Sequence, residues 1–328
     1  MEKKLLIICI AVSVCLTISC ISPDDIKTDI VQQYTKKINS EGVEDVPYVS
    51  KDGTRLYFHY SPFKFSDLHK GKKTVMGPLR GSTTMGDYNR QYFIGFVSEK
   101  IDNVWQEAVP INFEDNNHAW GSLDISSNGK FMYTIGPSES GKIDIYFHQL
   151  KDGVWRNPTK IEKINTKFLE DNPDISKDNT FLVWDSDRPD GLGMSDLWYS
   201  EKLPNGKWSE AKNFGEPLNS KYSENTPFLN DEGNRIYFNR LIPSEIRKGR
   251  ISIFVSENIK GKWSKPIELD LGVDVALSPS LTADENMIYI EIGEIKRNDP
   301  STLFESNFDI YYSIKRSDGS WGKAVPVD

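Results

Sequence analysis

The chain has 328 residues and a net charge of −8, with a pI near 5.2. Nucleic-acid binding needs a surface that neutralises phosphates, so this acidic balance argues against nucleic acid as a partner. All three cysteines, Cys9, Cys15 and Cys20, lie at the N-terminus, so the remainder of the chain has no thiol and no disulfide.

The N-terminus has the layout of a bacterial export signal. Two lysines precede an apolar run over residues 5–18, which is shorter than the ~20 residues that a spanning helix needs. Leu-Thr-Ile-Ser-Cys at residues 16–20 resembles the lipobox of bacterial lipoproteins, although Thr17 stands where leucine is usual. The resemblance implies a signal peptide over 1–19 and a palmitate-type lipid on Cys20, which would hold the protein in the cell envelope, at the outer membrane or periplasmic face. Cleavage without lipidation is the alternative.

Residues 20–42 are predicted to be a tether. Ile26, Ile30 and Tyr34 follow one another at near-helical spacing, which predicts a short helix within it.

From residue 43 onward, one β-rich unit is repeated five times. The frame Val-Pro-Tyr-Val-Ser-Lys-Asp-Gly-Thr-Arg-Leu-Tyr-Phe at 46–58 recurs as Asn-Pro-Asp-Ile-Ser-Lys-Asp-Asn-Thr-Phe-Leu-Val-Trp at 172–184. Further copies begin at Thr226 and Ser278, and a fifth has Leu123 in place of the proline. Each copy continues with an apolar strand, a polar turn, a tryptophan and a short strand. The tryptophans are Trp105, Trp155, Trp208, Trp263 and Trp321.

This content predicts an all-β fold, a five-bladed β-propeller with four-stranded antiparallel blades. Four strands are the content of one propeller blade, and blades packed around an axis cover the sheet faces that one blade alone would expose. We expect each tryptophan to lie between neighbouring blades. No strand is exchanged to close the ring in this prediction. The propeller covers 43–328, with blades at about 43–112, 117–165, 169–219, 222–271 and 273–328.

The first blade is interrupted by an insertion from His59 to Arg90, the most basic part of the chain. A long connection inside a compact domain is often functional or disordered, and one interpretation is that this insertion overhangs a binding face.

The repeat resembles a known family. The frame Pro-x-x-Ser-x-Asp-Gly-x-x-Leu-Tyr-Phe, followed by Ser-Asp-Arg-Pro-Asp-Gly-Leu-Gly-Met-Ser-Asp-Leu-Trp at 186–198, is similar to the WD-like repeats of TolB-type propellers over about 43–328. The resemblance implies the fold and an envelope protein. It is weak for function, because the family includes translocation partners, propellers attached to peptidases and many other exported proteins.

A propeller gathers distant residues at one channel mouth. The loop that enters each innermost strand and the loop between the second and third strands emerge on the same face. Carboxylates, a histidine, a tryptophan and arginines there would suit a sugar, a peptide or a cation. Acidic residues at such positions also cap turns, so a structural role stays open for each. The ligand-binding candidates are Glu44, Asp45, His118, Trp120, Glu170, Asp171, Asp187, Arg188, Glu224, Asn225 and Arg240.

Enzyme motifs are sparse. The chain contains no Gly-x-Ser-x-Gly and no His-Glu-x-x-His, and its four histidines are scattered, so we expect no metal and no cofactor. Asp185 to Gly191 differs from a calcium loop in its carboxylate spacing. The preferred hypothesis is a monomeric, membrane-anchored lipoprotein whose rim binds a glycan, peptide or protein.

The alternative is a carbohydrate-active hydrolase or lyase. Glycoside hydrolysis needs an acid and a base or nucleophile about 5 to 9.5 Å apart. The candidates for that pair are Glu44, Asp45, Asp171 and Glu224.

Overall fold

The structure is a computed structural model that describes residues 34, 38–62, 94–114, 120–140, 142–242, 250–293 and 308–328. The export signal, Cys20, most of the tether with its expected helix, most of the basic insertion and His118 lie outside these residues. None of the residues described belongs to a helix long and apolar enough to span a membrane.

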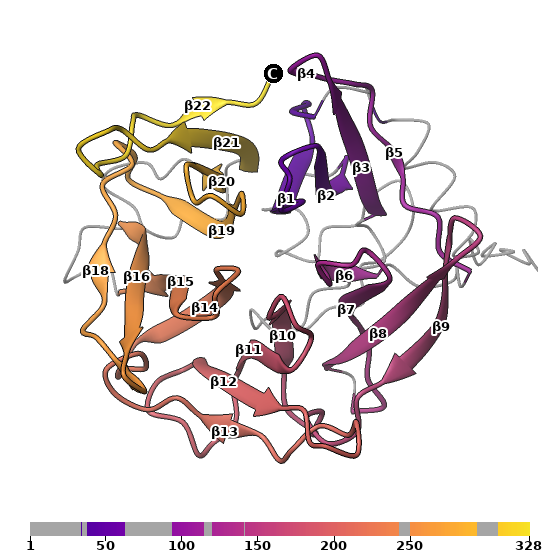
Figure 1. The fold of residues 1–328 in the computed structure, drawn as a ribbon, viewed down its shortest axis with the longest axis vertical. Helices are drawn as coiled ribbons and strands as arrows, with labels where there is room; N and C mark the ends of the chain where they lie inside the picture. Colours follow the sequence, from indigo (N-terminus) through magenta and orange to yellow (C-terminus); the bar gives the residue numbers. More distant parts are fainter. Residues whose placement is uncertain are drawn as a thin grey trace, which may run out of the picture.

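Five antiparallel sheets are arranged around a central axis, and the first strand of each lies innermost (Figure 1). This confirms the predicted all-β, five-bladed propeller. Blade 1 contains β1 (Val43–Val49), β2 (Arg55–Ser61), β3 (Ile94–Ile101), β4 (Val104–Trp105) and β5 (Val109–Pro110). Blade 2 contains β6 (Gly121–Ile125), β7 (Phe131–Pro137), β8 (Ile143–Lys151) and β9 (Val154–Lys160). Blade 3 contains β10 (Glu170–Ile175), β11 (Phe181–Ser186), β12 (Asp196–Glu201) and β13 (Lys212–Asn213). Blade 4 contains β14 (Ser223–Leu229), β15 (Arg235–Leu241), β16 (Ile251–Ile259), β17 (Lys262–Trp263) and β18 (Ile267–Glu268). Blade 5 contains β19 (Ala276–Leu281), β20 (Met287–Gly293), β21 (Phe308–Ile314) and β22 (Val325–Pro326).

The two faces of the disc differ in their connections. One face, which we call the turn face, carries the tight hairpins between the first and second strands. In blade 1 the Asp52 carboxylate accepts bonds from the Ser50 hydroxyl at 2.6 Å and the Thr54 amide at 3.0 Å, and Gly53 supplies the positive φ of 71°. The opposite face, the loop face, carries the connections between the second and third strands.

A β-bulge interrupts the pairing of all five innermost strands, and in four of them it includes the residue before the frame's proline. The register shifts between Asp45 and Tyr48 in β1, and equivalent shifts occur in the other innermost strands. In those four strands the bulged residues have positive φ although none is glycine, and they are Val46, Asn172, Thr226 and Ser278. Since this conformation is strained for side chains with a Cβ, neighbouring groups must hold it in place.

The core lies between the blades rather than within one of them. Each hydrophobic cluster joins two neighbouring blades; one example combines Phe58 of β2 with Tyr289 of β20. The tryptophans take part as expected. Trp105 lies 6.1 Å from Tyr289 of blade 5, and Trp208 lies 6.4 Å from Tyr133 of blade 2. Aromatic packing across the joints therefore holds the disc together.

The ring closes without strand exchange, because each blade is made of consecutive strands. The Asn39 side chain instead bonds both backbone groups of Ile310 in blade 5, at 2.8 and 2.9 Å. The same two-bond contact joins Asn165 to Ile145 between blades 2 and 3, and Asn219 to Leu197 between blades 3 and 4. At the closing joint, Asp328 adds bonds to the Ile38 and Asn39 amides. The joint between the first and last blades therefore uses the same asparagine contact as two joints between consecutive blades.

Candidate functional site

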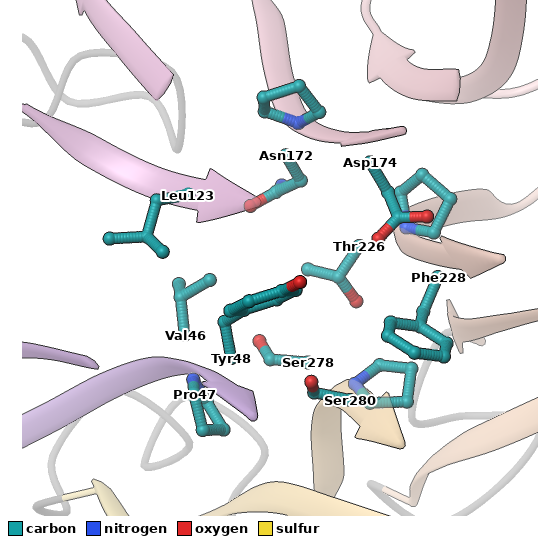
Figure 2. Close-up of a pocket in the computed structure, with 13 residues that line it drawn as sticks. Val46, Pro47, Tyr48, Leu123, Asn172, Asp174, Thr226, Phe228, Ser278 and Ser280 are labelled. Carbon is teal, nitrogen blue, oxygen red and sulfur yellow. The ribbon is translucent and has the colours of Figure 1, made fainter. Parts of the chain in front are cut away.

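The axis of the disc is almost filled. The innermost strands leave a cavity of about 30 Å³ that is lined by residues such as Val46, Asn172, Thr226 and Ser278. Figure 2 shows Tyr48 extending into the space between these strands, and its hydroxyl donates to the Ile125 carbonyl at 3.0 Å. A cavity of this size holds about one water molecule, so this stretch of the channel, between the described innermost strands, has no room for a sugar ring or a peptide.

A first polar layer surrounds the axis near the loop face. In blade 3 the buried Asp185 carboxylate accepts bonds from the Asn172 side chain at 2.8 Å and from the Thr226 amide of blade 4 at 3.0 Å. Burial, reinforced by the neighbouring charge of Asp171, raises the pKa of Asp185 to about 7. Asn225, also of blade 4, donates to Asp185 at 3.2 Å. Asp185 therefore holds the bulge of the next blade in place.

Glu291 does the same at the closing joint. It is bonded to the Ser278 hydroxyl at 3.0 Å, and it contacts the Val46 amide and the Asp45 side chain of blade 1. Burial, followed by the charge of Asp45, raises the pKa of Glu291 well above its usual range. Two of the predicted candidates, Asp45 and Asp171, thus each lie beside a buried carboxyl group at the channel mouth.

A second polar layer lies deeper in the channel, and the sequence reasoning missed it. Asp124 accepts from the Ile175 amide of the next blade at 2.6 Å, and Asp174 accepts from the Leu229 amide at 2.7 Å. Burial raises the pKa of both carboxyl groups, with the charge of Asp124 adding to the effect at Asp174. In the sequence, both aspartates stand directly after the frame's proline position, and this shared place could have indicated the layer.

Three predicted candidates, Glu44, Glu170 and Glu224, lie fully buried within the wall and do not line the channel. Each accepts bonds from the amide and hydroxyl of a serine or threonine four residues earlier. These partners are Ser40, Thr166 and Ser220. The missed signal was the spacing Asn-[Ser/Thr]-x-x-x-Glu, since the preceding asparagine makes the two-bond joint described above.

Two predicted arginines belong to the same wall. Arg240 donates to Glu224 at 2.6 Å and to the Leu218 carbonyl at 2.9 Å. Arg188 donates to Glu170 at 3.1 Å, and its guanidinium lies 4.9 Å from the centre of the Trp198 ring. Their side chains are only 13% and 10% exposed, so these arginines are committed to internal ion pairs.

Trp120 and Asp187 lie away from the channel. Trp120 is buried in the cluster between blades 1 and 2, 5.2 Å from the Tyr146 ring. Asp187 accepts from the Leu169 amide at 2.7 Å and remains one-third exposed. A ligand-binding role stays a prediction for all the candidates.

The connection between β11 and β12 presents an apolar pair on the loop face. Leu192 is 51% exposed and Met194 is 69% exposed. Their loop is held firmly, because the Asp196 carboxylate accepts the Leu192 and Gly193 amides at 2.6 and 2.9 Å. A Cβ on Gly193 would lie 1.7 Å from the Tyr222 carbonyl oxygen, so only glycine fits there. Neither residue was among the candidates predicted from the sequence.

Metal chemistry finds no support in the part of the chain that the structure describes. No group of three or more histidine, cysteine, aspartate or glutamate side chains there is arranged to hold a metal ion.

No family model matches the chain, and no curated protein matches it. Among solved structures, a putative TolB from Agrobacterium tumefaciens matches with 13% identity and a TM-score of 0.49, over 90% of this chain and 85% of that one. TolB from Acinetobacter baumannii matches with 11% identity and a TM-score of 0.46, over 84% of this chain and 53% of that one. An α-L-arabinofuranosidase from Lactobacillus brevis matches with 15% identity and a TM-score of 0.46, over 91% and 99% of the two chains.

Proposed function

We propose that the protein is a lipid-anchored envelope protein that binds a peptide, protein or glycan partner through the loop face of its propeller. The observation that carries this proposal is the exposed Leu192 and Met194 pair on a loop whose backbone is fixed by Asp196. A loop whose backbone is already fixed loses little backbone entropy on binding, and methionine adapts its shape to a partner.

The chemistry of the channel mouth favours binding over hydrolysis. The acidic side chains there are paired at short range, as Asp45 and Glu291 are, whereas glycoside hydrolysis needs about 5 to 9.5 Å between the two carboxyl groups. Glu44 and Glu224, two members of the proposed catalytic set, are bound to their own loops inside the wall. The hydrolase alternative therefore receives no specific support from the geometry.

Replacing both Leu192 and Met194 by aspartate is expected to weaken partner binding at least about tenfold, because two apolar contacts are lost and charge is added. A matched control is Ile267→Asp, since Ile267 is 68% exposed but lies on the outer strand β18. Binding is measured with immobilised protein against glycan arrays and detergent-solubilised envelope proteins, with product release followed in parallel. Equal loss in the two variants, or release of sugar products by the wild type, would overturn the proposal.

The membrane anchor has its own test. Cys20→Ala removes the sulfur that would carry the lipid, so the protein is expected to move from the membrane fraction to the soluble fraction. Metabolic labelling with a palmitate analogue should mark the wild type only. An unlabelled wild type that fractionates like the variant would favour cleavage without lipidation.

A further inference from the structure

A groove of about 710 Å³ lies on the turn face between blades 3 and 4. Its floor contains four half-buried aromatic rings whose centres follow one another at 4.7 to 5.9 Å. These rings are Phe181, Tyr199, Phe214 and Trp263. The groove is on the face opposite the loop that carries the proposed function, so what it binds is a separate question.

The internal repeat shows what such a tryptophan position accommodates. In three blades, the residue paired with the repeat tryptophan across the hairpin is a lysine, and its ammonium lies over the ring. The pairs are Lys100 with Trp105 at 5.0 Å, Lys202 with Trp208 at 5.3 Å, and Lys315 with Trp321 at 5.7 Å. The tryptophan of the repeat therefore binds a cation over its ring, and in these three blades a lysine of the same blade provides that cation.

Blade 4 has an asparagine at the position where these three blades have the lysine. The residue paired with Trp263 is Asn258, whose side chain turns back to the Gly261 amide at 2.8 Å. The equivalent groove between blades 5 and 1 has about 680 Å³, and it is lined by Lys100 but not by Trp105. In the groove between blades 3 and 4, by contrast, both Asn258 and Trp263 line the surface. The substitution of lysine by asparagine thus opens the ring to the groove.

The charges around Trp263 suit a cation. Four carboxylates line the groove, and two of them are already paired with lysines: Glu201 with Lys212 at 2.8 Å, and Asp231 with Lys177 at 2.9 Å. The other two, Asp178 and Glu232, form no ion pair with any lysine or arginine in the described residues. The Lys212 ammonium lies over the Tyr199 ring at 5.5 Å, and no lysine or arginine among the described residues lies over the Trp263 ring.

We propose that this groove binds a lysine or arginine side chain of a basic peptide or protein segment, with the cation over Trp263 and beside Glu232. The bound segment would then place a cation over Trp263, as a lysine of the same blade does over the repeat tryptophan in blades 1, 3 and 5. A neutral glycan could stack on the same rings and donate its hydroxyls to the carboxylates, but it carries no cation to replace the lysine of the other blades.

The test uses the full-length protein and a fluorescent tetra-arginine peptide, with tetra-glutamine and cellotriose as competitors. We expect tetra-arginine to bind, to weaken with added salt, and to be displaced by neither competitor. Asn258→Lys should reduce its affinity at least about fivefold by seating a cation over Trp263, whereas Asn258→Gln should not, although both lose the bond to Gly261. Asn286→Lys adds the same charge elsewhere on the turn face and should have little effect.

Glu232→Gln should weaken binding about threefold, because one unpaired carboxylate is neutralised while its oxygen can still accept the bond from Asn230. Equal affinity in Asn258→Lys and Asn258→Gln, or no preference for tetra-arginine over tetra-glutamine, would overturn the proposal. Displacement by cellotriose would also overturn it and would assign the rings to a glycan instead. The Leu192 and Met194 variants leave this groove intact, so failure on one face is distinguishable from failure on the other.

Discussion

Asn39→Ala is expected to lower the free energy of unfolding by about 2 to 4 kcal/mol, because the Ile310 amide loses its acceptor and the Ile310 carbonyl keeps only the bond from the Val327 amide. Blades 5 and 1 are the only neighbouring blades among the five that are not joined by consecutive chain. Its remaining contacts include the bond from the Val49 amide to Ser280 and the bond from the Ala283 amide to the Lys51 carbonyl. Loss of Asn39 should therefore let β1 separate from blade 5 before the rest of the disc unfolds.

Denaturant unfolding gives the overall change, and hydrogen exchange locates the opening. The matched control is Asn219→Ala, which removes the same two bonds to Leu197 between blades that consecutive chain connects. We expect similar losses of unfolding free energy but faster exchange at β1 and β21 in Asn39→Ala alone. If exchange at these strands rises equally in both variants, the closing joint is no weaker than an internal one.

The fold could be predicted because its signals are local and repeated. The frame around Pro173 specifies an innermost strand and its hairpin turn, and the same letters recur where the other blades begin. The tryptophans mark the ends of the blades for the same reason. Closure of the ring was partly predictable: the absence of an exchanged strand followed from the order of the strands, whereas the contact of Asn39 with Ile310 joins residues 271 apart.

The site was harder to predict because strand alternation does not say which face meets the channel. Glu44 and Asp45 are neighbours, yet one contacts Ser40 inside the wall and the other contacts Glu291 at the mouth. The bulge after Asp45 then changes the alternation, so the next polar residue toward the axis falls after the proline instead. A bulge that depends on a carboxylate from the preceding blade cannot be recognised from its own strand.

The buried glutamates differ in one respect that sets a pH dependence. Glu170 and Glu224 have Arg188 and Arg240 beside them, whereas Glu44 pairs across the strands with Tyr60 and lies near other carboxylates. Burial, opposed only in part by the bonds from Ser40, raises the pKa of Glu44 from 4.5 to about 8. The folded protein therefore keeps Glu44 protonated at neutral pH.

Because the folded pKa lies above the unfolded one, the contribution of Glu44 to stability is complete below about pH 4.5 and is lost as the pH rises through about 8. The full loss corresponds to about 5 kcal/mol at most, since each pKa unit is worth about 1.4 kcal/mol. Other buried carboxyl groups, Asp185 among them, give the wild type a similar slope, so the comparison with a variant isolates Glu44.

Glu44→Gln replaces the protonated acid by an amide that does not titrate, and its oxygen can still accept from Ser40. Denaturant unfolding measured from pH 5 to 9 should show similar stability for the two proteins at pH 5 and an advantage for the variant of about 2 to 4 kcal/mol at pH 9. Glu224→Gln is the control, because it leaves Arg240 buried without its charge partner and should destabilise the protein across the whole range. Parallel curves for the wild type and Glu44→Gln would mean that Glu44 is ionised in the folded protein, with its charge balanced by the Ser40 contacts alone.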